Sequence, residues 1–148
     1  GFVSRGLGDV YKRQGYMPED RKLIPSMSAE ENILTPVWAT NILDWKMRLE
    51  WIYKIIPEAL ELKDRPSTSL SGGQQKLIAL SRALMVGSKL LLLDEPSEGI
   101  APALAKRIID ILNDLKKEGV TTLIAESNAG HYKGMLDKSF VIERGQIN

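Results

Sequence analysis

The sequence predicts an α/β fold with a mainly parallel sheet core and an α-helical subdomain on one side of it. Residues 89–148 alternate between strand-like and helical stretches, and such alternation is typical of parallel sheets with helical crossovers. Residues 28–86, in contrast, show helical patterns only. A chain of 148 residues corresponds to about one domain and is long enough to bury a core.

The spacing of apolar residues locates the individual elements. Continuous aliphatic runs indicate strands, and apolar residues three and four positions apart indicate helices. The expected elements are, in order, a strand ending at 17, helices at 28–34, 44–62 and 72–86, a strand at 89–95, a helix from 102 to about 118, a strand at 121–125, a helix at 128–136 and a strand at 139–142. We expect the strands at 89–95 and 121–125 to be buried on both faces, as parallel strands usually are.

Prolines and capping residues define several boundaries. Pro18 ends the first strand, because proline cannot donate to a sheet ladder. Pro36 is expected to close the short helix, which Ser28 and Glu31 begin with the spacing of a capping box. Pro57 either kinks the longer helical region or begins a second helix within it.

The N-terminal stretch GFVSRGLGDVYKRQ shows neither a helical nor a strand period. It resembles translated sequencing-adapter read-through at the edge of an assembled fragment. We interpret residues 1–14 as a non-native N-terminal scar and exclude them from the fold prediction. The alternative, a natural interior loop, stays open.

The composition is that of an ordinary globular protein and excludes several classes of function. Apolar residues make up 43% and charged residues 26% of the chain, and the net charge is +1. We therefore expect no nucleic-acid partner, since no excess of basic charge is available. The chain has no cysteine, which excludes a disulfide framework and a thiolate metal site.

A serine and two glycines stand at the start of the helix expected at 72–86. Ser71 can cap this helix, and Gln74 is at the reciprocal capping position. Gly72 and Gly73 cost helix stability, about 1 kcal/mol each relative to alanine, which suggests a purpose beyond capping. Two glycines leave backbone amides uncovered, and the helix dipole favours an anion there. The alternative is a plain flexible helix entry.

Two adjacent carboxylates, Asp94 and Glu95, end the aliphatic strand LLLL. Ligands of open parallel sheets bind beyond the carboxyl ends of the strands. Successive strand residues point to opposite faces, so the two acids need not share one role. One can hold a magnesium ion through water, and the other can accept a proton from an attacking water. An acidic turn without function is the alternative.

Taken together, these motifs resemble those of the ABC-type ATPases. LSGGQQKLIALSRALM resembles the signature helix of this family, and LLLLDEPSEGIAP resembles its Walker B strand and D-loop. Two further segments, GYMPEDRKLIPSMSAEENIL and GVTTLIAESNAG, are similar to the ATP-binding subunits of branched-chain amino acid uptake systems. The resemblance covers residues 15–148. It implies a partial P-loop NTPase domain with a helical subdomain at about 28–86 and an α/β part at about 87–148.

The resemblance also implies roles for individual residues, with ATP and Mg²⁺ as cofactors. Asp94 would hold Mg²⁺ through water, and Glu95 would be the general base. In this family two domains meet head to tail, so the signature helix faces ATP that a partner subunit holds. The residues facing the γ-phosphate of that ATP would be Ser71, Gly72, Gly73 and Gln74.

The sequence departs from the family pattern at several positions. It contains no Gly-Lys dipeptide and therefore no Walker A loop, so we interpret the chain as the C-terminal part of a longer protein that does not hold ATP by itself. Glu19 occupies the Q-loop position, as is usual in the amino acid uptake branch. The switch histidine maps to Ser127. His131 lies four residues later, about one helical turn along, and we interpret it as an ordinary surface or packing histidine, with a displaced switch residue as the alternative. The D-loop aspartate maps to Ala101.

The expected function is that of the ATP-hydrolysing subunit of an ABC importer for branched-chain or other hydrophobic amino acids. The implied partners are a second ABC ATPase subunit and transmembrane permease subunits, which place the protein on the cytoplasmic face of the inner membrane. We expect the permease contact between Glu19 and Trp51, with Trp38 and Trp45 as anchors. The alternatives are a chromosome, DNA-repair or ribosome-associated ABC ATPase, and a degenerate domain that only completes its partner's site.

Overall fold

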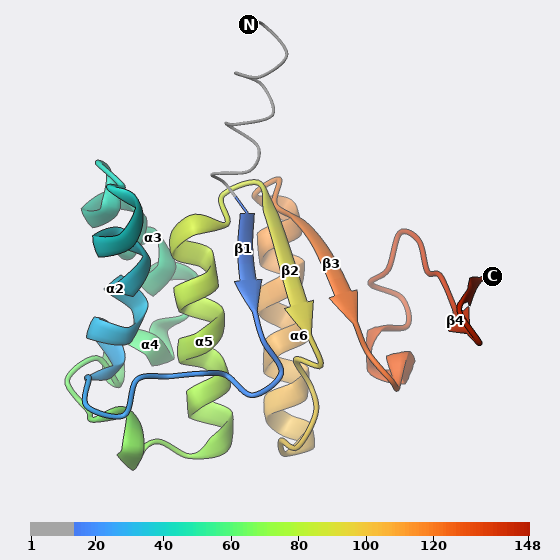
Figure 1. Cartoon of the computed structure of the whole chain (residues 1–148), viewed down its shortest axis with the longest axis horizontal. Coiled ribbons are helices and arrows are strands. Elements are labelled where there is room, and N and C mark those ends of the chain that lie inside the picture. Colours follow the sequence, from blue (N-terminus) through green and yellow to red (C-terminus); the bar gives the residue numbers. More distant parts are fainter. Residues whose placement is uncertain (1–13) are drawn as a thin grey trace, which may run out of the picture.

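The computed structural model describes residues 14–148 of the chain (Figure 1). The elements are β1 Gln14–Met17, α2 Ala29–Thr40, α3 Trp45–Ile55, α4 Pro57–Glu61, the 3-10 helix η1 Ser67–Ser69, α5 Gly72–Val86, β2 Leu90–Asp94, α6 Pro102–Lys117, β3 Thr121–Ala125, the 3-10 helix η2 Ala129–Tyr132, β4 Ile142–Glu143 and β5 Gln146–Ile147. The segment interpreted as an N-terminal scar lies outside the described residues, apart from Gln14, which begins β1.

A three-stranded parallel sheet with the order β1-β2-β3 forms the centre of the fold. The predicted α/β class with a parallel sheet is confirmed. The prediction of a strand at 139–142 is wrong except for Ile142, which begins β4. β4 and β5 instead pair with each other as an antiparallel hairpin that is separate from the sheet, and the ERGQ turn joins them (Figure 1). Two residues on each side of a tight turn pair locally before they can reach a distant sheet edge.

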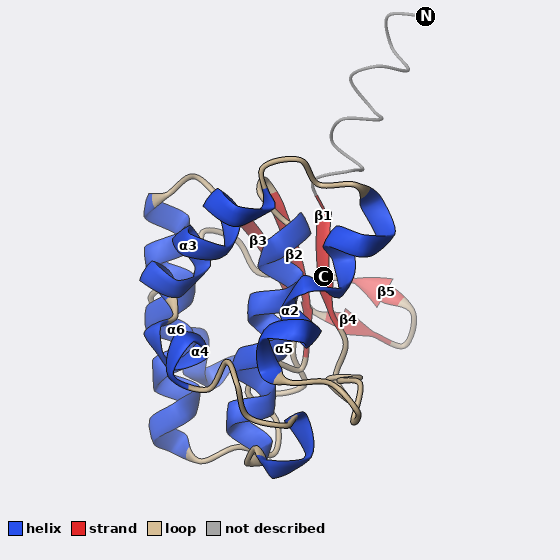
Figure 2. Ribbon diagram, turned by 90° about the vertical axis from the view of Figure 1, so that its left-hand side faces the viewer, coloured by secondary structure: helices blue, strands red, loops and turns tan. Residues whose placement is uncertain are grey.

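The helices cover one face of the sheet. α5 packs against β1 and α2, while α6 contacts β3 and lies behind the sheet (Figures 1 and 2). The core is a single cluster of buried apolar side chains from these layers. Its fully buried members include Met17, Ile33, Ile52, Ile56, Ile78, Leu80, Leu84, Leu91, Ile108, Ile111 and Leu115.

The other face of the sheet is open within residues 14–148. The strand register aligns Tyr16, Leu92 and Leu123 in one row across β1, β2 and β3. Tyr16 is 57% exposed and Leu123 is 60% exposed, whereas the opposite-facing Leu93 is 2% exposed. The expectation that the strands at 89–95 and 121–125 are buried on both faces is therefore wrong for this chain. The aliphatic runs do form strands, as predicted, but no described element packs on the second face of these strands.

Helix α2 runs through Pro36 instead of ending there, which corrects the predicted boundary. A proline within a helix leaves the carbonyl four residues earlier without its amide donor. That carbonyl belongs to Asn32, and the Thr35 hydroxyl donates to it (2.9 Å). The helix ends at Asn41, whose left-handed backbone (φ 52°) stops it. A neighbouring side chain thus satisfies the carbonyl that the proline leaves free.

The remaining helical boundaries follow the local chemistry. Pro57 begins α4 at its first turn, so the second of the two expectations for this residue is confirmed. The helix expected at 128–136 is reduced to η2, because Lys133 leaves the helical conformation (φ −56°, ψ 129°), and Gly134 after it has a left-handed backbone (φ 91°). None of the helices in the described part of the chain is long and apolar enough to span a membrane.

The open face leads to a stability prediction for two leucines of the sheet. Leu93→Ala should lower the free energy of unfolding by about 2–5 kcal/mol, because Leu93 is buried against the helices. Leu123→Ala should change it by less than about 1 kcal/mol. Urea denaturation of the chain measures both values. Equal losses would show that the second face is covered as well.

The start of α6 leads to a second stability prediction. Ala101 has the extended backbone of an N-cap (φ −62°, ψ 146°) but makes no side-chain cap bond. Ala101→Ser should raise the free energy of unfolding by about 1 kcal/mol by supplying an acceptor for the first-turn amides. Ser28→Ala, which removes the existing cap of α2, is the control with the opposite sign. An unchanged denaturation midpoint for Ala101→Ser would contradict this cap geometry.

Candidate functional site

The predicted signature motif forms the N-terminal end of α5. Ser71 is the N-cap, and its Oγ accepts a hydrogen bond from the Gln74 amide (3.2 Å). The Ser71 amide in turn donates to Gln74 Oε1 (2.9 Å), which completes the predicted capping box. Ser71 is exposed, so the positive end of the helix dipole faces solvent at this point. This end of α5 is suited to an anion that approaches from outside the chain.

The two glycines after Ser71 have different surroundings. A Cβ atom at Gly72 would meet only the Arg21 guanidinium, at 3.5 Å. Gly73 is buried, and a Cβ atom there would lie 1.8 Å from Leu104 Cδ2 of α6. Gly73 therefore packs against the end of the Leu104 side chain, and a larger residue at this position would have to displace that side chain. Gly72 is half-buried, and its nearest neighbour is the Arg21 side chain.

Asp94 is the last residue of β2 and lies in register with Ala125 of β3. It lines a hollow of about 240 Å³ on the open face of the sheet. The other lining residues are Tyr16, Leu92, Leu93, Leu123 and Ala125. The carboxylate of Asp94 therefore stands where the sheet ends, beside an apolar surface.

Glu95 leaves the strand through a left-handed backbone conformation (φ 46°), which is uncommon for a residue with a side chain. Its Oε1 accepts a hydrogen bond from the Ser127 amide (2.8 Å), and the Ser127 hydroxyl lies 3.3 Å from Oε2. The predicted general base and the predicted switch position are thus in direct contact. Two donors from one residue hold the carboxylate in a single orientation.

Glu126 is a functional candidate that the sequence analysis missed. Its Oε1 accepts hydrogen bonds from the Ser97 amide (2.9 Å), the Ser97 hydroxyl (2.7 Å) and the Tyr132 hydroxyl (2.9 Å). Burial opposes ionisation, but the bonds from Ser97 outweigh it and hold the pKa of Glu126 below its ordinary value. The available signal was its position directly after β3, at the same sheet edge as the Asp94–Glu95 pair.

Glu126 also influences Glu95. A hydrogen bond between the two carboxyl groups, followed by partial burial, raises the pKa of Glu95 above its ordinary value, while the Ser127 amide acts against this. A general base works best when its pKa lies near the operating pH. The direction of this shift therefore suits the predicted role of Glu95.

Lys76 is a second residue that the sequence analysis missed. Its side chain is 1% exposed, and its Nζ donates to the backbone carbonyl of Glu95. Burial, followed by the charge of Arg21, lowers the pKa of Lys76. Lys76 therefore joins the second turn of α5 to the turn after β2. A lysine within a signature-like helix gives no sequence signal for such a contact.

Glu19, at the predicted Q-loop position, lies near the same acids. The charge of Glu98 raises the pKa of Glu19, and Asp94 adds to the effect. This repulsion between carboxylates is a condition that a cation would relieve. No group of three or more His, Cys, Asp or Glu residues within residues 14–148 has the arrangement of a preformed metal site. The donor set fits Mg²⁺, which proteins commonly bind through one or two carboxylates together with substrate phosphates.

The structure brings only part of the predicted site together. Asp94, Glu95, Ser127 and Glu19 gather at the carboxyl ends of the strands. No hydrogen bond among the described residues joins Ser71 to these acids.

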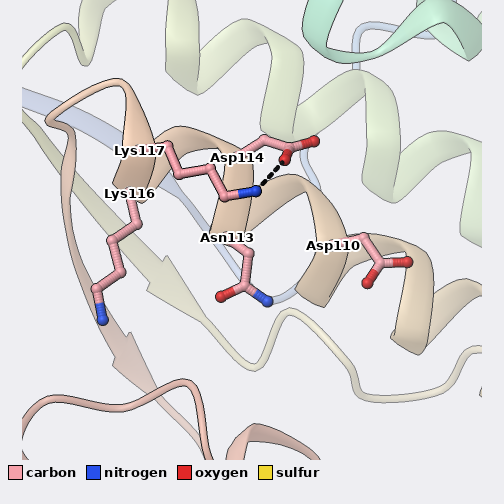
Figure 3. A pocket seen from close by; sticks show the side chains of 5 residues that line it. All are labelled: Asp110, Asn113, Asp114, Lys116 and Lys117. Carbon is pink, nitrogen blue, oxygen red and sulfur yellow. Dashed lines mark ion pairs between the residues drawn. The ribbon is translucent and has the colours of Figure 1, made fainter.

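A second and larger hollow lies elsewhere on the described surface. It measures about 550 Å³ and occupies the outer face of α6 (Figure 3). Its lining residues are Asp110, Asn113, Asp114, Lys116 and Lys117. Asp114 and Lys117 already pair with each other (3.6 Å), and all five side chains come from one helix. The hollow contains no residue of the predicted site.

Comparisons with known proteins bear on the identity of the chain. A sequence model of the family described as ABC transporter matches residues 5–98. The chain is 35% identical over 131 residues to the high-affinity branched-chain amino acid transport ATP-binding protein BraG of Pseudomonas aeruginosa, a match that covers 88% of this chain and 56% of that protein. It is 30% identical over 135 residues to the lipopolysaccharide export system ATP-binding protein LptB of Acidithiobacillus ferridurans, covering 90% of this chain and 56% of that protein.

The fold has known relatives as well. A crystal structure of an ATP-binding cassette of an ABC transporter in its ADP conformation superposes with a TM-score of 0.79 at 28% identity, covering 96% of this chain and 61% of that one. The chain thus spans about half the length of the curated relatives it matches. Family match, relatives and fold agree: the chain belongs to the ABC transporter family and represents part of its ATP-binding domain.

Proposed function

We propose that this chain is part of an ATP-hydrolysing subunit that powers an importer of branched-chain or other hydrophobic amino acids. The observation that carries the proposal is the contact between Glu95 and Ser127 at the sheet edge. It orients a carboxylate beside Asp94, as a hydrolytic site requires, while the exposed cap at Ser71 stays free to face another molecule.

The signature end of α5 binds the γ-phosphate of ATP that a second ATPase subunit carries. Support for this role comes from the exposed N-cap at Ser71 and from Gly72, where an added Cβ atom would lie no closer than 3.5 Å to a neighbouring side chain. The chain contains no Gly-Lys dipeptide to form a phosphate cradle of its own. An exposed helix cap without a phosphate cradle in the same chain agrees with an arrangement in which each subunit completes the site of the other.

The acids at the sheet edge act on nucleotide bound to the same subunit. Glu95 orients the attacking water and takes its proton, and the Ser127 amide keeps the carboxylate in place. Asp94 and Glu19 supply oxygen ligands, the latter at the Q-loop position. These carboxylates would hold Mg²⁺, which would supply positive charge to neutralise the phosphates. Ser127 donates hydrogen bonds but carries no proton charge near neutral pH, unlike a histidine.

The likeness to BraG supports amino acids as the substrate class. LptB, a lipopolysaccharide export protein, also matches, so specificity for the transported solute belongs to other subunits of the assembly. The degenerate, non-catalytic reading rests on Ser127 and Ala101. The contact between Ser127 and Glu95 favours the catalytic reading, because a serine at the switch position still holds the base.

The proposed contact with transmembrane permease subunits involves α2 and α3. Trp38 is 61% exposed, and Leu43 and Met47 are exposed beside the same turn. Trp45 instead packs partly against the core, with Lys46 over its ring (5.5 Å), so it is the weaker of the two predicted anchors. This face lies within the predicted span of Glu19 to Trp51 and would bring the subunit to the cytoplasmic side of the membrane.

The role of Glu95 is tested by Glu95→Gln in a polypeptide that carries these residues together with a phosphate-binding loop. Hydrolysis should slow roughly 100- to 10,000-fold, the usual worth of a general base, while ATP binding and the ATP-driven dimer persist. Phosphate release and size-exclusion chromatography measure the two effects. Glu118→Gln, an exposed change at the end of α6, is the control. Unchanged turnover in Glu95→Gln would remove Glu95 from the role of base.

The role of the signature end is tested by Ser71→Arg in the same polypeptide. The bulky cation should abolish the ATP-driven dimer and leave ATP binding by the monomer intact. Ser28→Arg is the matched control, because it removes an equivalent capping box from α2. Loss of monomer binding in Ser71→Arg would show that α5 faces its own chain's nucleotide.

A further inference from the structure

Two arginines tie the connector at residues 18–22 to helix α5. The Arg82 guanidinium donates from Nη1 to the Lys22 carbonyl (2.7 Å) and from Nη2 to the Arg21 carbonyl. The Arg21 guanidinium points back along the helix, where its Nη1 donates to Gln75 Oε1 (3.3 Å). Its nitrogen atoms lie 3.5 and 3.6 Å from the place of a Cβ atom at Gly72. The connector thus contacts α5 at both its middle and its N-terminal turn.

The connected residues share one face of α5. Gly72 and Gln75 are three residues apart, and Gln75 and Arg82 are seven apart, which is the spacing of side chains on one helical face. The connector crosses α5 between β1 and α2 (Figure 1). It therefore bridges two turns of the helix and is not attached at a single point.

The backbone of the connector needs such support. Arg21 and Lys22 both have left-handed conformations (φ 65° and 46°), which cost free energy in residues with side chains. The local turn bonds are the Arg21 amide to the Pro18 carbonyl (3.2 Å) and the Lys22 amide to the Asp20 carbonyl (2.7 Å). Strained backbone persists only where its surroundings hold it, and Arg82 occupies the two carbonyls of this pair.

We propose that Arg82 and Arg21 are positioning residues that couple the connector bearing Glu19 to the N-terminal end of α5 bearing Ser71. The functional role of this coupling rests on the proposed function. A displacement that reaches the connector from the α2–α3 face is passed to the end of α5 that faces the second subunit. The coupling itself needs no nucleotide, because every contact in it belongs to this chain.

Hydrogen exchange of backbone amides in the 148-residue chain tests the coupling. In Arg82→Gln, exchange of the Arg21 and Lys22 amides should rise roughly tenfold or more, the worth of hydrogen bonds from a charged donor. Exchange of the Gln74 and Gln75 amides, in the first turn of α5, should rise with it. Amides of β2 and α6 should keep their rates.

Arg48 supplies a matched control. Its guanidinium also donates to two backbone carbonyls, those of Leu84 (2.9 Å) and Gly87 (3.1 Å), but at the other end of α5. Arg48→Gln should loosen that end and leave the connector amides unchanged. Arg82→Lys should keep the urea midpoint of the wild type, but the connector amides should still exchange faster than in the wild type. The reason is that an ammonium group cannot match the two-point geometry of a guanidinium.

The reverse substitution completes the test. Arg21→Gln removes the contact with Gln75, and exchange should then rise at both the Gln75 and the Lys22 amides, since coupling between two sites is reciprocal. Faster exchange in the connector alone, with Gln74 and Gln75 unchanged, would overturn the proposal. A uniform rise over β2 and α6 would overturn it too, since Arg82 would then serve global stability. Both results are independent of the ATPase experiments, which require nucleotide.

Discussion

The close packing of α5 against the sheet is the constraint on which the rest of the structure depends. A Cβ atom at Gly15 would lie 2.0 Å from the Ala83 carbonyl oxygen, so backbone meets backbone where α5 crosses β1. At Gly73 the helix also contacts the end of the Leu104 side chain of α6. The backbone contact at Gly15 leaves no room for a side chain between α5 and β1. The capped end of α5 faces solvent, while Lys76, one turn further, reaches the carbonyl of the residue that follows β2.

The chemistry at the sheet edge arises from competition among carboxylates. Glu126 receives three hydrogen bonds on one oxygen and keeps its charge more readily, whereas Glu95 shares a hydrogen bond with it and has a raised pKa. Neighbouring acids in different surroundings commonly take different roles. Ser97 links this pair to the segment before α6, and Ser127 orients Glu95. The site thus depends on segments after two adjacent strands, β2 and β3.

The open face of the sheet explains how a partial domain can keep the family fold. One face buries its leucines under α5 and α6, and the core formed there includes residues from every long helix. The other face leaves Tyr16 and Leu123 largely exposed, so part of the hydrophobic free energy of the sheet is not gained within residues 14–148. The curated relatives are nearly twice as long as the matched region. The core between the sheet and the helices therefore stabilises the shared fold within residues 14–148.

Local patterns determined the features that depend on near neighbours. The capping boxes at Ser28 and Ser71 and the alternation of strands and helices from β2 onwards were predictable, since caps and amphipathic periods involve residues a few positions apart. The position of the acids after β2 was predictable for the same reason. The tertiary structure decided that α2 continues through Pro36, that Gly73 is buried beside Leu104, and that Glu126 joins the site. Each of these features depends on which atoms fill the space around a residue or satisfy its polar groups. Packing between elements that are distant in the sequence determines those atoms, and the spacing of residues along the chain does not reveal them.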